Sequence, residues 1–269
     1  MTKVSNRWAS PTLGASAIEF LAAIRSEMPV SLIATPRAKF KCERRKRWAG
    51  IESNPDLADF DQVPLTSDGS DHIEAVFVRG SGLVELREDM FMASDAPLVS
   101  FLESADQQRF RFLLEDRSVS GMVTLSDVQK LPVYSVLFSL VIAVEMLLMD
   151  CIRNVCDADK DGWLAYLREG QRKSVEKYWK NALKKNLAID RLSCASFGQE
   201  IEAAAGLGLF KHHDERHRGL KELAVLRDQV CHAIEFAPTP EQALKIPSHV
   251  RTAQSTATWL LAQMRAPTA

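Results

Sequence analysis

The chain has 269 residues, of which 46% are hydrophobic and 26% charged, a balance typical of soluble globular proteins and a length sufficient for two domains. Its 34 Lys and Arg residues are offset by 35 Asp and Glu, so net charge indicates neither nucleic-acid nor membrane binding. Five irregularly spaced cysteines do not form a disulfide framework and fit a reducing compartment. Since the opening residues MTKVSNRWASPTLG also lack the apolar core of a secretory signal, we expect a cytoplasmic protein.

Short apolar runs separated by turn residues fill the first half of the chain. The runs 30–35, 60–78 and 109–127 are typical of strands, with hairpin turns at 66–71 and 115–118. Residues 17–24, 55–60 and 97–104 are instead typical of short helices. The pattern therefore predicts an α+β N-terminal half.

Helical periodicity dominates the second half. Apolar residues recur at helical spacing in 133–155, 160–185, 190–206, 214–236 and 247–265, which predicts an all-α bundle. The uncharged run 133–144 is shorter than the roughly 20 residues that span a bilayer, and Glu145 and Asp150 interrupt its continuation. We expect a buried helix there and no membrane contact.

The first half also contains an internal repeat. Residues 60–83 and 109–131 each give a strand, a polar turn, a second strand and a polar segment. The second of these segments contains the stretch GMVTLSD, which runs from Gly121 to Asp127 and includes Thr124 and Ser126. This stretch resembles the G-h-h-T-x-x-D ending of CBS domains, where h is apolar. The resemblance implies a tandem CBS pair over 31–132, with repeats at about 31–86 and 87–132, on which segment 1–30 packs.

CBS pairs of this pattern commonly bind adenine nucleotides, and the resemblance implies AMP, ATP or a related nucleotide as a regulatory ligand. Asp127 would hold the ribose hydroxyls, and Thr124 and Ser126 would contact phosphate. A carboxylate and hydroxyls at a helix start suit these roles. The alternative is that Ser126 or Asp127 only caps the following helix. The first repeat lacks the matching Thr and Asp, so one nucleotide site is expected.

The stretch RDQVCH places Arg227, Asp228 and His232 in a helix whose other face carries Leu220, Leu223, Leu226, Val230 and Ile234. It resembles the R-x4-6-H signature of HEPN domains, and Glu145 resembles an acidic residue often found in their first helix. The resemblance covers 133–266 within a domain at 133–269. It implies a metal-independent ribonuclease with no required cofactor, acting on RNA.

Elementary chemistry assigns a role to each of these four residues. His232 would remove the 2′-hydroxyl proton or protonate the leaving oxygen, and Arg227 would stabilise charge on the phosphoryl group. Asp228 would orient the imidazole, and Glu145 would hold Arg227. Residues five apart on a helix point about 140° away from each other, so a composite site in a homodimer is expected.

Two other sequence patterns, a basic run and a histidine cluster, allow a purely structural explanation as well as a binding role. Six cations between Lys39 and Arg47 could bind phosphates but are more typical of a solvated face. His212, His213 and His217 lack an H-E-x-x-H arrangement, so no metal site is predicted. The alternative function is a non-catalytic regulatory protein whose bundle serves dimerisation or the binding of a partner or RNA. A nucleotide-sensing module gating a stress or defence effector is an analogy from domain roles.

Overall fold

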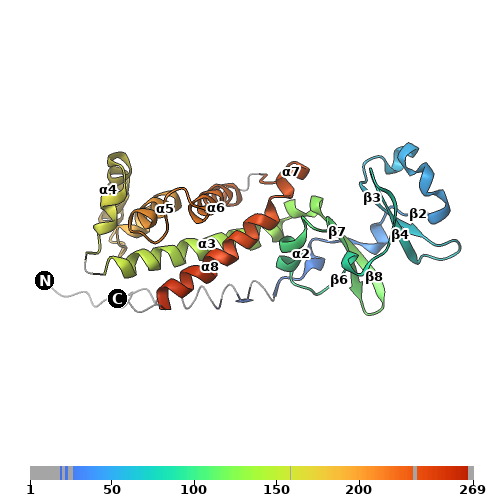
Figure 1. Cartoon of the computed structure of the whole chain (residues 1–269), viewed down its shortest axis with the longest axis horizontal. Helices are drawn as coiled ribbons and strands as arrows, with labels where there is room; N and C mark the ends of the chain where they lie inside the picture. Colours follow the sequence, from blue (N-terminus) through green and yellow to red (C-terminus); the bar gives the residue numbers. More distant parts are fainter. Residues whose placement is uncertain (1–18, 20–21, 24–26, 158, 233–234, 266–269) are drawn as a thin grey trace. The chain divides into compact units, whose positions relative to one another are not determined.

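The computed structural model describes residues 19, 22–23, 27–157, 159–232 and 235–265. The described chain divides into two compact units, an α/β unit formed by Pro29–Val128 and a helical unit that begins at Gln129 (Figure 1). The mixed α/β half and the helical half agree with the expected fold class. The predicted segment 1–30 lies largely outside the described residues.

Two four-stranded sheets form the α/β unit. One has the order β1-β8-β7-β6 and the other the order β2-β3-β4-β5. The strands are β1 (Thr35–Pro36), β2 (Glu43–Arg44), β3 (Gln62–Thr66), β4 (Ile73–Val78), β5 (Gly82–Glu85), β6 (Phe91–Ala93), β7 (Phe110–Glu115) and β8 (Ser118–Thr124). The helical segments are α2 (Leu98–Ser104) and the 3-10 turns η1 (Val30–Leu32), η2 (Arg37–Lys39), η3 (Arg45–Ser53), η4 (Pro55–Leu57), η5 (Glu88–Met90) and η6 (Leu125–Gln129).

The predicted repeat is confirmed by the strand pairing. In each sheet a short strand is followed by a helical segment, then by a strand parallel to the first, and then by an antiparallel hairpin partner. Both predicted hairpin turns occur between these strands, with Asp116 in the left-handed region at φ 52°. The repeats differ after the hairpin, because β4 continues into the antiparallel strand β5 whereas β8 continues into η6.

Strand β4 has apolar residues on both faces. Ala75 and Phe77 face a cluster that includes Ile51 and Leu57 from η3 and η4. Val76 faces a second cluster that joins the two sheets through Met90, Phe110 and Phe112 of the second repeat. The two repeats therefore share one apolar interface, as expected of a duplicated module whose halves cannot each close a core.

The strand predicted at residues 30–35 is wrong. Val30 to Leu32 form the 3-10 turn η1, and the backbone N–H groups of Val30 and Ser31 donate to Ala96 and Ser94 rather than to a sheet. Only Thr35 and Pro36 form a strand, which pairs with β8 of the second repeat. Burial of Val30 and Ile33 explains the apolar run without a strand.

The helical unit contains five helices longer than two turns among the described residues. They are α3 (Leu131–Val155), α4 (Glu169–Lys184), α5 (Phe197–Gly206), α6 (Glu215–Cys231) and α8 (Ile246–Arg265), with the short α7 (Pro240–Ala243) and the turns η7 (Gly162–Tyr166) and η8 (Leu192–Cys194). Helix α3 packs against α5, α6 and α8, and Figure 1 shows α8 running alongside it. The all-helical prediction is confirmed.

Helix α3 is the central element of this unit. It is long and apolar enough to cross a membrane by length and composition, with a window of mean hydropathy 2.2, but 61% of that window is buried inside the fold. Its buried side chains recur every three or four residues: Val133, Val136, Leu137, Leu140, Val141, Val144, Leu147, Leu148, Cys151 and Ile152. This burial is consistent with the core helix of a soluble protein.

Truncation of α3 tests its central position. Leu147 is fully buried, so Leu147→Ala should lower the free energy of unfolding by about 2–5 kcal/mol through lost apolar contacts and a residual cavity. The same truncation at the exposed Leu183 of α4 should change it by less than about 0.5 kcal/mol. Chemical denaturation of the two variants measures the difference, and equal effects would contradict the assignment of α3 as core.

Candidate functional site

The RDQVCH stretch lies at the end of α6. The helix ends at Cys231, and His232 is its C-terminal cap, with φ −96° and ψ 10°. The prediction that the helix continues to residue 236 is therefore wrong, and Ile234 lies outside the described residues. Pro238 and Pro240 follow closely, and proline cannot continue a helix. As a result His232 is exposed at a helix end instead of lying within the apolar helix.

Arg227 is held from two sides. Its guanidinium lies 3.3 Å from the carboxylate of Glu145 on α3 and donates to Asp228 at 3.2 Å. Glu145 is buried, whereas the side chain of Arg227 is 31% exposed. The expected contact between Glu145 and Arg227 is confirmed. Asp228, expected to orient His232, instead accepts from Arg227, and within the described part of the chain its carboxylate makes no contact with the imidazole.

A third acidic residue, Glu200 of α5, belongs to this cluster and was missed at the sequence level. It is 1% exposed, and its Oε2 has no hydrogen-bond partner within the described residues. Burial and the nearby Glu145 carboxylate raise the pKa of Glu200 to about 9, against the attraction of Arg227. A signal was available in the sequence, since Glu200 lies three residues after the apolar Phe197 and four before Ala204, on the same face of the helix.

The two buried carboxyl groups of the cluster therefore differ in protonation. Burial also raises the pKa of Glu145, and attraction to Arg227 offsets this only in part. Burial lowers the pKa of Arg227, but Glu145 and Asp228 outweigh burial and leave that pKa raised. A protonated Glu200 beside a Glu145–Arg227 ion pair leaves the buried part of the cluster close to neutral, which limits the cost of desolvation.

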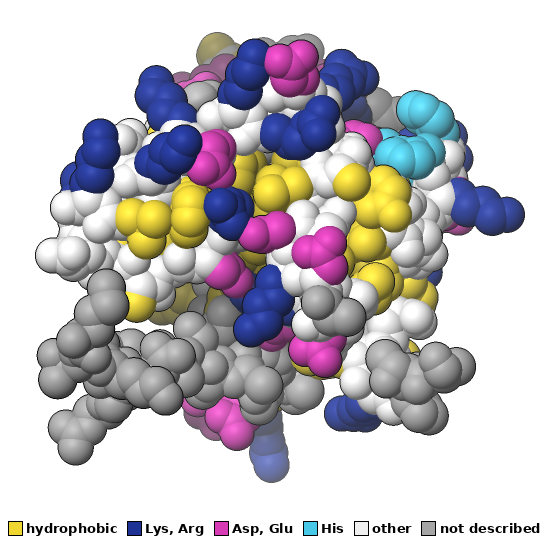
Figure 2. All heavy atoms as spheres, turned by 90° about the vertical axis from the view of Figure 1, so that its left-hand side faces the viewer, with side chains coloured by type: hydrophobic (Ala, Val, Ile, Leu, Met, Phe, Trp, Pro, Cys, Tyr) yellow, Lys and Arg dark blue, Asp and Glu magenta, His cyan; other side chains and the backbone are white. Residues whose placement is uncertain are grey.

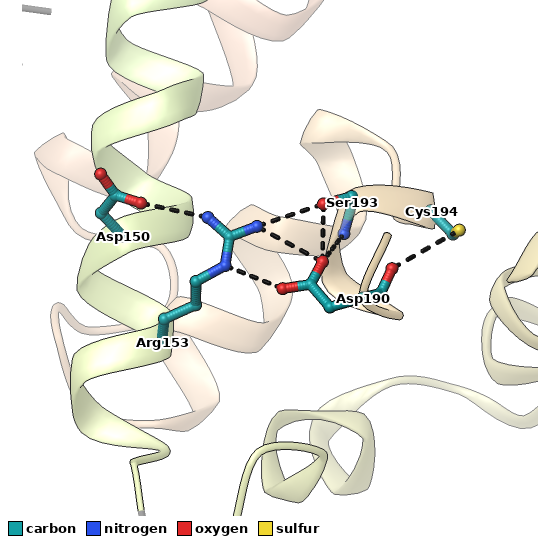
Figure 3. Close-up of polar contacts among 5 residues, drawn as sticks. All are labelled: Asp150, Arg153, Asp190, Ser193 and Cys194. Atoms are coloured by element: carbon teal, nitrogen blue, oxygen red, sulfur yellow. Dashed lines mark hydrogen bonds and ion pairs between the residues drawn. The ribbon is translucent and has the colours of Figure 1, made fainter. Parts of the chain in front are cut away.

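A second ionic network fixes the far end of α3. The guanidinium of Arg153 lies between Asp150 and Asp190, donating to them at 3.1 and 2.9 Å and to Ser193 at 3.2 Å (Figure 3). Burial raises the pKa of Asp190, but the hydrogen bonds from Arg153 and Ser193 outweigh it and lower that pKa overall. The positive charge of Arg153 also acts against the raised pKa of Glu200. The network joins α3 to the turn η8, which precedes α5.

Several basic side chains that could contact phosphate, on α4 and in the segment Lys39–Arg47, are instead paired within the protein. On α4, Lys173 and Lys180 form ion pairs with Glu169 and Glu176 one turn away. In the α/β unit, Arg44 donates to the carbonyls of Ser67 and Ser70 in the β3–β4 turn, while Arg45 and Lys46 pair with Glu85 and Asp68. Figure 2 shows Lys and Arg interspersed with Asp and Glu, without one dominant basic surface on that face. These pairings favour the solvated-face interpretation of the basic segments.

The three residues expected to bind a nucleotide lie together after β8. The Asp127 carboxylate accepts from the backbone N–H of Thr124 at 2.7 Å and from its hydroxyl at 3.1 Å, and Thr124 also contacts the Ser126 hydroxyl at 2.7 Å. Asp127 is buried. One carboxylate oxygen is thus committed to closing its own turn, which is the capping role left open by the sequence.

The raised pKa of Glu200 predicts a pH dependence of stability. Between its ordinary 4.5 and about 9, the folded chain keeps a proton that the unfolded chain has released. The free energy of unfolding should therefore fall as pH rises through this window, and Glu200→Gln should flatten that slope. Denaturation from pH 5 to 9 measures it, with exposed Glu222→Gln on α6 as the matched control. An unchanged slope in Glu200→Gln would contradict a protonated Glu200.

Comparison with protein-family models, with curated proteins and with solved structures gives no match for this chain. Neither unit is therefore assigned to a family by similarity. What the helical unit does has to be inferred from its own side chains and their geometry.

Proposed function

We propose that the helical unit is a HEPN-like, metal-independent endoribonuclease domain that acts as a homodimer, and that the CBS-like α/β unit senses an adenine nucleotide. The observation that supports this most directly is the state of Arg227. A buried carboxylate, Glu145, positions the guanidinium, yet part of the guanidinium side chain stays exposed near a helix end that carries the exposed His232. A held cation and an exposed imidazole are the two groups that metal-independent cleavage of a phosphodiester needs.

The chemistry needs no metal. His232 would remove the proton of the ribose 2′-hydroxyl or protonate the leaving 5′-oxygen, because an imidazole has one nitrogen that can accept a proton and one that can donate it. Arg227, held by Glu145, would stabilise the charge that develops on the phosphoryl oxygens. Asp228 contributes by holding the guanidinium. The substrate would be RNA, because DNA lacks the attacking hydroxyl.

One chain does not complete this site. Arg227 and His232 are separated by five positions at the end of α6, and side chains at that spacing leave a helix about 140° apart. A second copy related by a twofold axis would bring Arg227 of one chain beside His232 of the other. The proposal therefore includes a homodimer in the cytoplasm, with two equivalent composite sites.

A non-catalytic regulatory protein is the second candidate function. It is favoured by the burial of Glu145 and Glu200 around Arg227, since such a cluster also serves as a polar junction among three helices. In that case the α/β unit would bind the nucleotide and the helical unit would dimerise or bind a partner.

Cleavage of a structured and an unstructured RNA in excess EDTA tests the first candidate. His232→Ala should lower the rate at least about 100-fold without loss of stability, because His232 is exposed. The exposed His72 of the α/β unit provides the control, and His72→Ala should cleave normally. A DNA of the same sequence should remain intact. Absence of cleavage by the folded wild type, or equal cleavage by His232→Ala, would favour the regulatory protein.

Mixing two inactive variants tests the composite site. Arg227→Ala and His232→Ala chains, each inactive alone, should regain up to about a quarter of wild-type activity when mixed. Half of the random dimers are heterodimers, and each of these retains one complete site. Mixtures of either variant with itself are the control. No recovery in proven heterodimers would contradict a site shared between chains.

Binding of AMP or ATP to the whole chain tests the α/β unit. Calorimetry should give one site per chain, and Asp127→Asn should weaken binding about tenfold or more, because one negative acceptor of the ribose hydroxyls is lost. Asparagine retains an oxygen that can accept from the Thr124 N–H, so the turn should persist. Exposed Asp59→Asn should bind normally. No binding at millimolar nucleotide would leave Asp127 as a capping residue alone.

A further inference from the structure

Three side chains from different parts of the helical unit converge at one end of α6. Glu202 comes from α5, His212 from the connection after α5, and His217 from the first turns of α6. Their candidate ligand atoms all lie within 4.8 Å of one another. The sequence did not indicate this set, because Glu202 is ten positions before His212 and belongs to another helix.

The distances approach those of a transition-metal site. Glu202 Oε1 lies 3.5 Å from His217 Nε2, and Glu202 Oε2 lies 3.7 Å from His212 Nδ1. Two ligands at about 2.1 Å from a tetrahedral Zn²⁺ are separated by about 3.4 Å. The two carboxylate contacts therefore need to close by only a few tenths of an ångström.

His217 is oriented toward this cluster without a hydrogen bond of its own. Its side chain is 7% exposed, and Nε2 has no hydrogen-bond partner within the described residues. A buried nitrogen without a partner costs free energy unless something occupies its lone pair.

The loop before α6 holds the histidines in place. The Asp214 carboxylate accepts from the backbone N–H of His217 at 2.7 Å and from that of Lys211 at 3.1 Å. The first hydrogen bond caps α6, and the second closes the loop before it. His213 adopts the left-handed region at φ 65°, which turns the chain between His212 and the cap. The Phe210 ring packs near the His217 ring, with centroids 6.2 Å apart.

Lys221 is a neighbour that opposes a metal. Its ammonium lies 2.6 Å from Glu202 Oε1, so it already neutralises the carboxylate, and its charge would repel a cation. Lys221 is one turn after His217 on α6 and is 39% exposed, so its flexible side chain can move into solvent. A metal would compete with Lys221 for one carboxylate oxygen.

We propose that Glu202, His212 and His217 bind a transition-metal ion, with Zn²⁺ as the best-fitting ion and water completing a tetrahedral site. The ion joins α5 to the start of α6 and stabilises that pairing. His217 precedes Arg227 by ten residues, about 15 Å along the helix, so the ion takes no part in the chemistry proposed for Arg227 and His232.

Titration of the metal-free full chain with Zn²⁺ tests this site. We expect one ion per chain, a rise in melting temperature with Zn²⁺, and weaker binding at acidic pH, where protons compete with Zn²⁺ for the histidine nitrogens. His212→Ala, at an exposed position, and Glu202→Gln should each weaken binding at least about tenfold, whereas His72→Ala should not. Binding that persists in both ligand variants, or no binding at 100 μM Zn²⁺, would overturn the proposal.

Removal of the competing Lys221 ammonium should change Zn²⁺ affinity in the opposite direction from removal of a ligand. Lys221→Met should tighten Zn²⁺ binding several-fold, whereas a cluster that exists only as a salt bridge would lose stability and gain no affinity. EDTA should lower the melting temperature of the zinc-loaded chain while leaving any RNA cleavage in place. The proposed metal site and the proposed nuclease activity are therefore tested independently, because the first is measured by Zn²⁺ binding and melting temperature and the second by RNA cleavage.

Discussion

The helical unit depends on one constraint, the burial of the Glu145 and Glu200 carboxyl groups beside the partly exposed guanidinium of Arg227, where α3, α5 and α6 meet. Two carboxylates and one guanidinium cannot all be charged in an apolar interior without a large desolvation cost. The raised pKa of Glu200 resolves this, because a protonated carboxyl leaves Glu145 and Arg227 as a single ion pair. A shift of α6 against α3 would separate the pair and leave a buried charge. The ion pair thus constrains the alignment of α6 on α3.

The same constraint prepares Arg227 for a role beyond packing. A guanidinium on an exposed helix surface would sample many rotamers, and ordering it on binding would cost entropy. Glu145 and Asp228 instead form ion pairs with the Arg227 guanidinium from two sides, while part of the side chain stays accessible. His232 is exposed for a different reason, since α6 ends one residue before it. The held cation thus arises from the interior of the bundle, and the exposed imidazole from the helix terminus.

Local patterns predicted most of the elements, and long-range contacts account for the differences. The hairpins, the duplicated strand order and α3 follow from apolar periodicity and turn residues, which neighbouring residues determine. The 3-10 turn at Val30 and the end of α6 depend on partners elsewhere or on backbone geometry that periodicity does not record. Glu145 was found through a resemblance and Glu200 could have been found from its place on an apolar helix face, whereas the role of Glu202 becomes visible only once α5 is placed beside α6.

Helix α5 links the two clusters of the helical unit. Glu200 and Glu202 are two positions apart, so they leave α5 about 160° apart and face different surroundings. Glu200 points into the junction with α3, and Glu202 meets the histidines and Lys221 at the start of α6. Because α6 also carries Arg227, any ion that tightens the Glu202 contact restricts motion of α6 against α5. Helix α6 is thus held near both of its ends, by the Asp214 cap and the Glu202 contacts at its start and by the Glu145–Arg227 ion pair near its end.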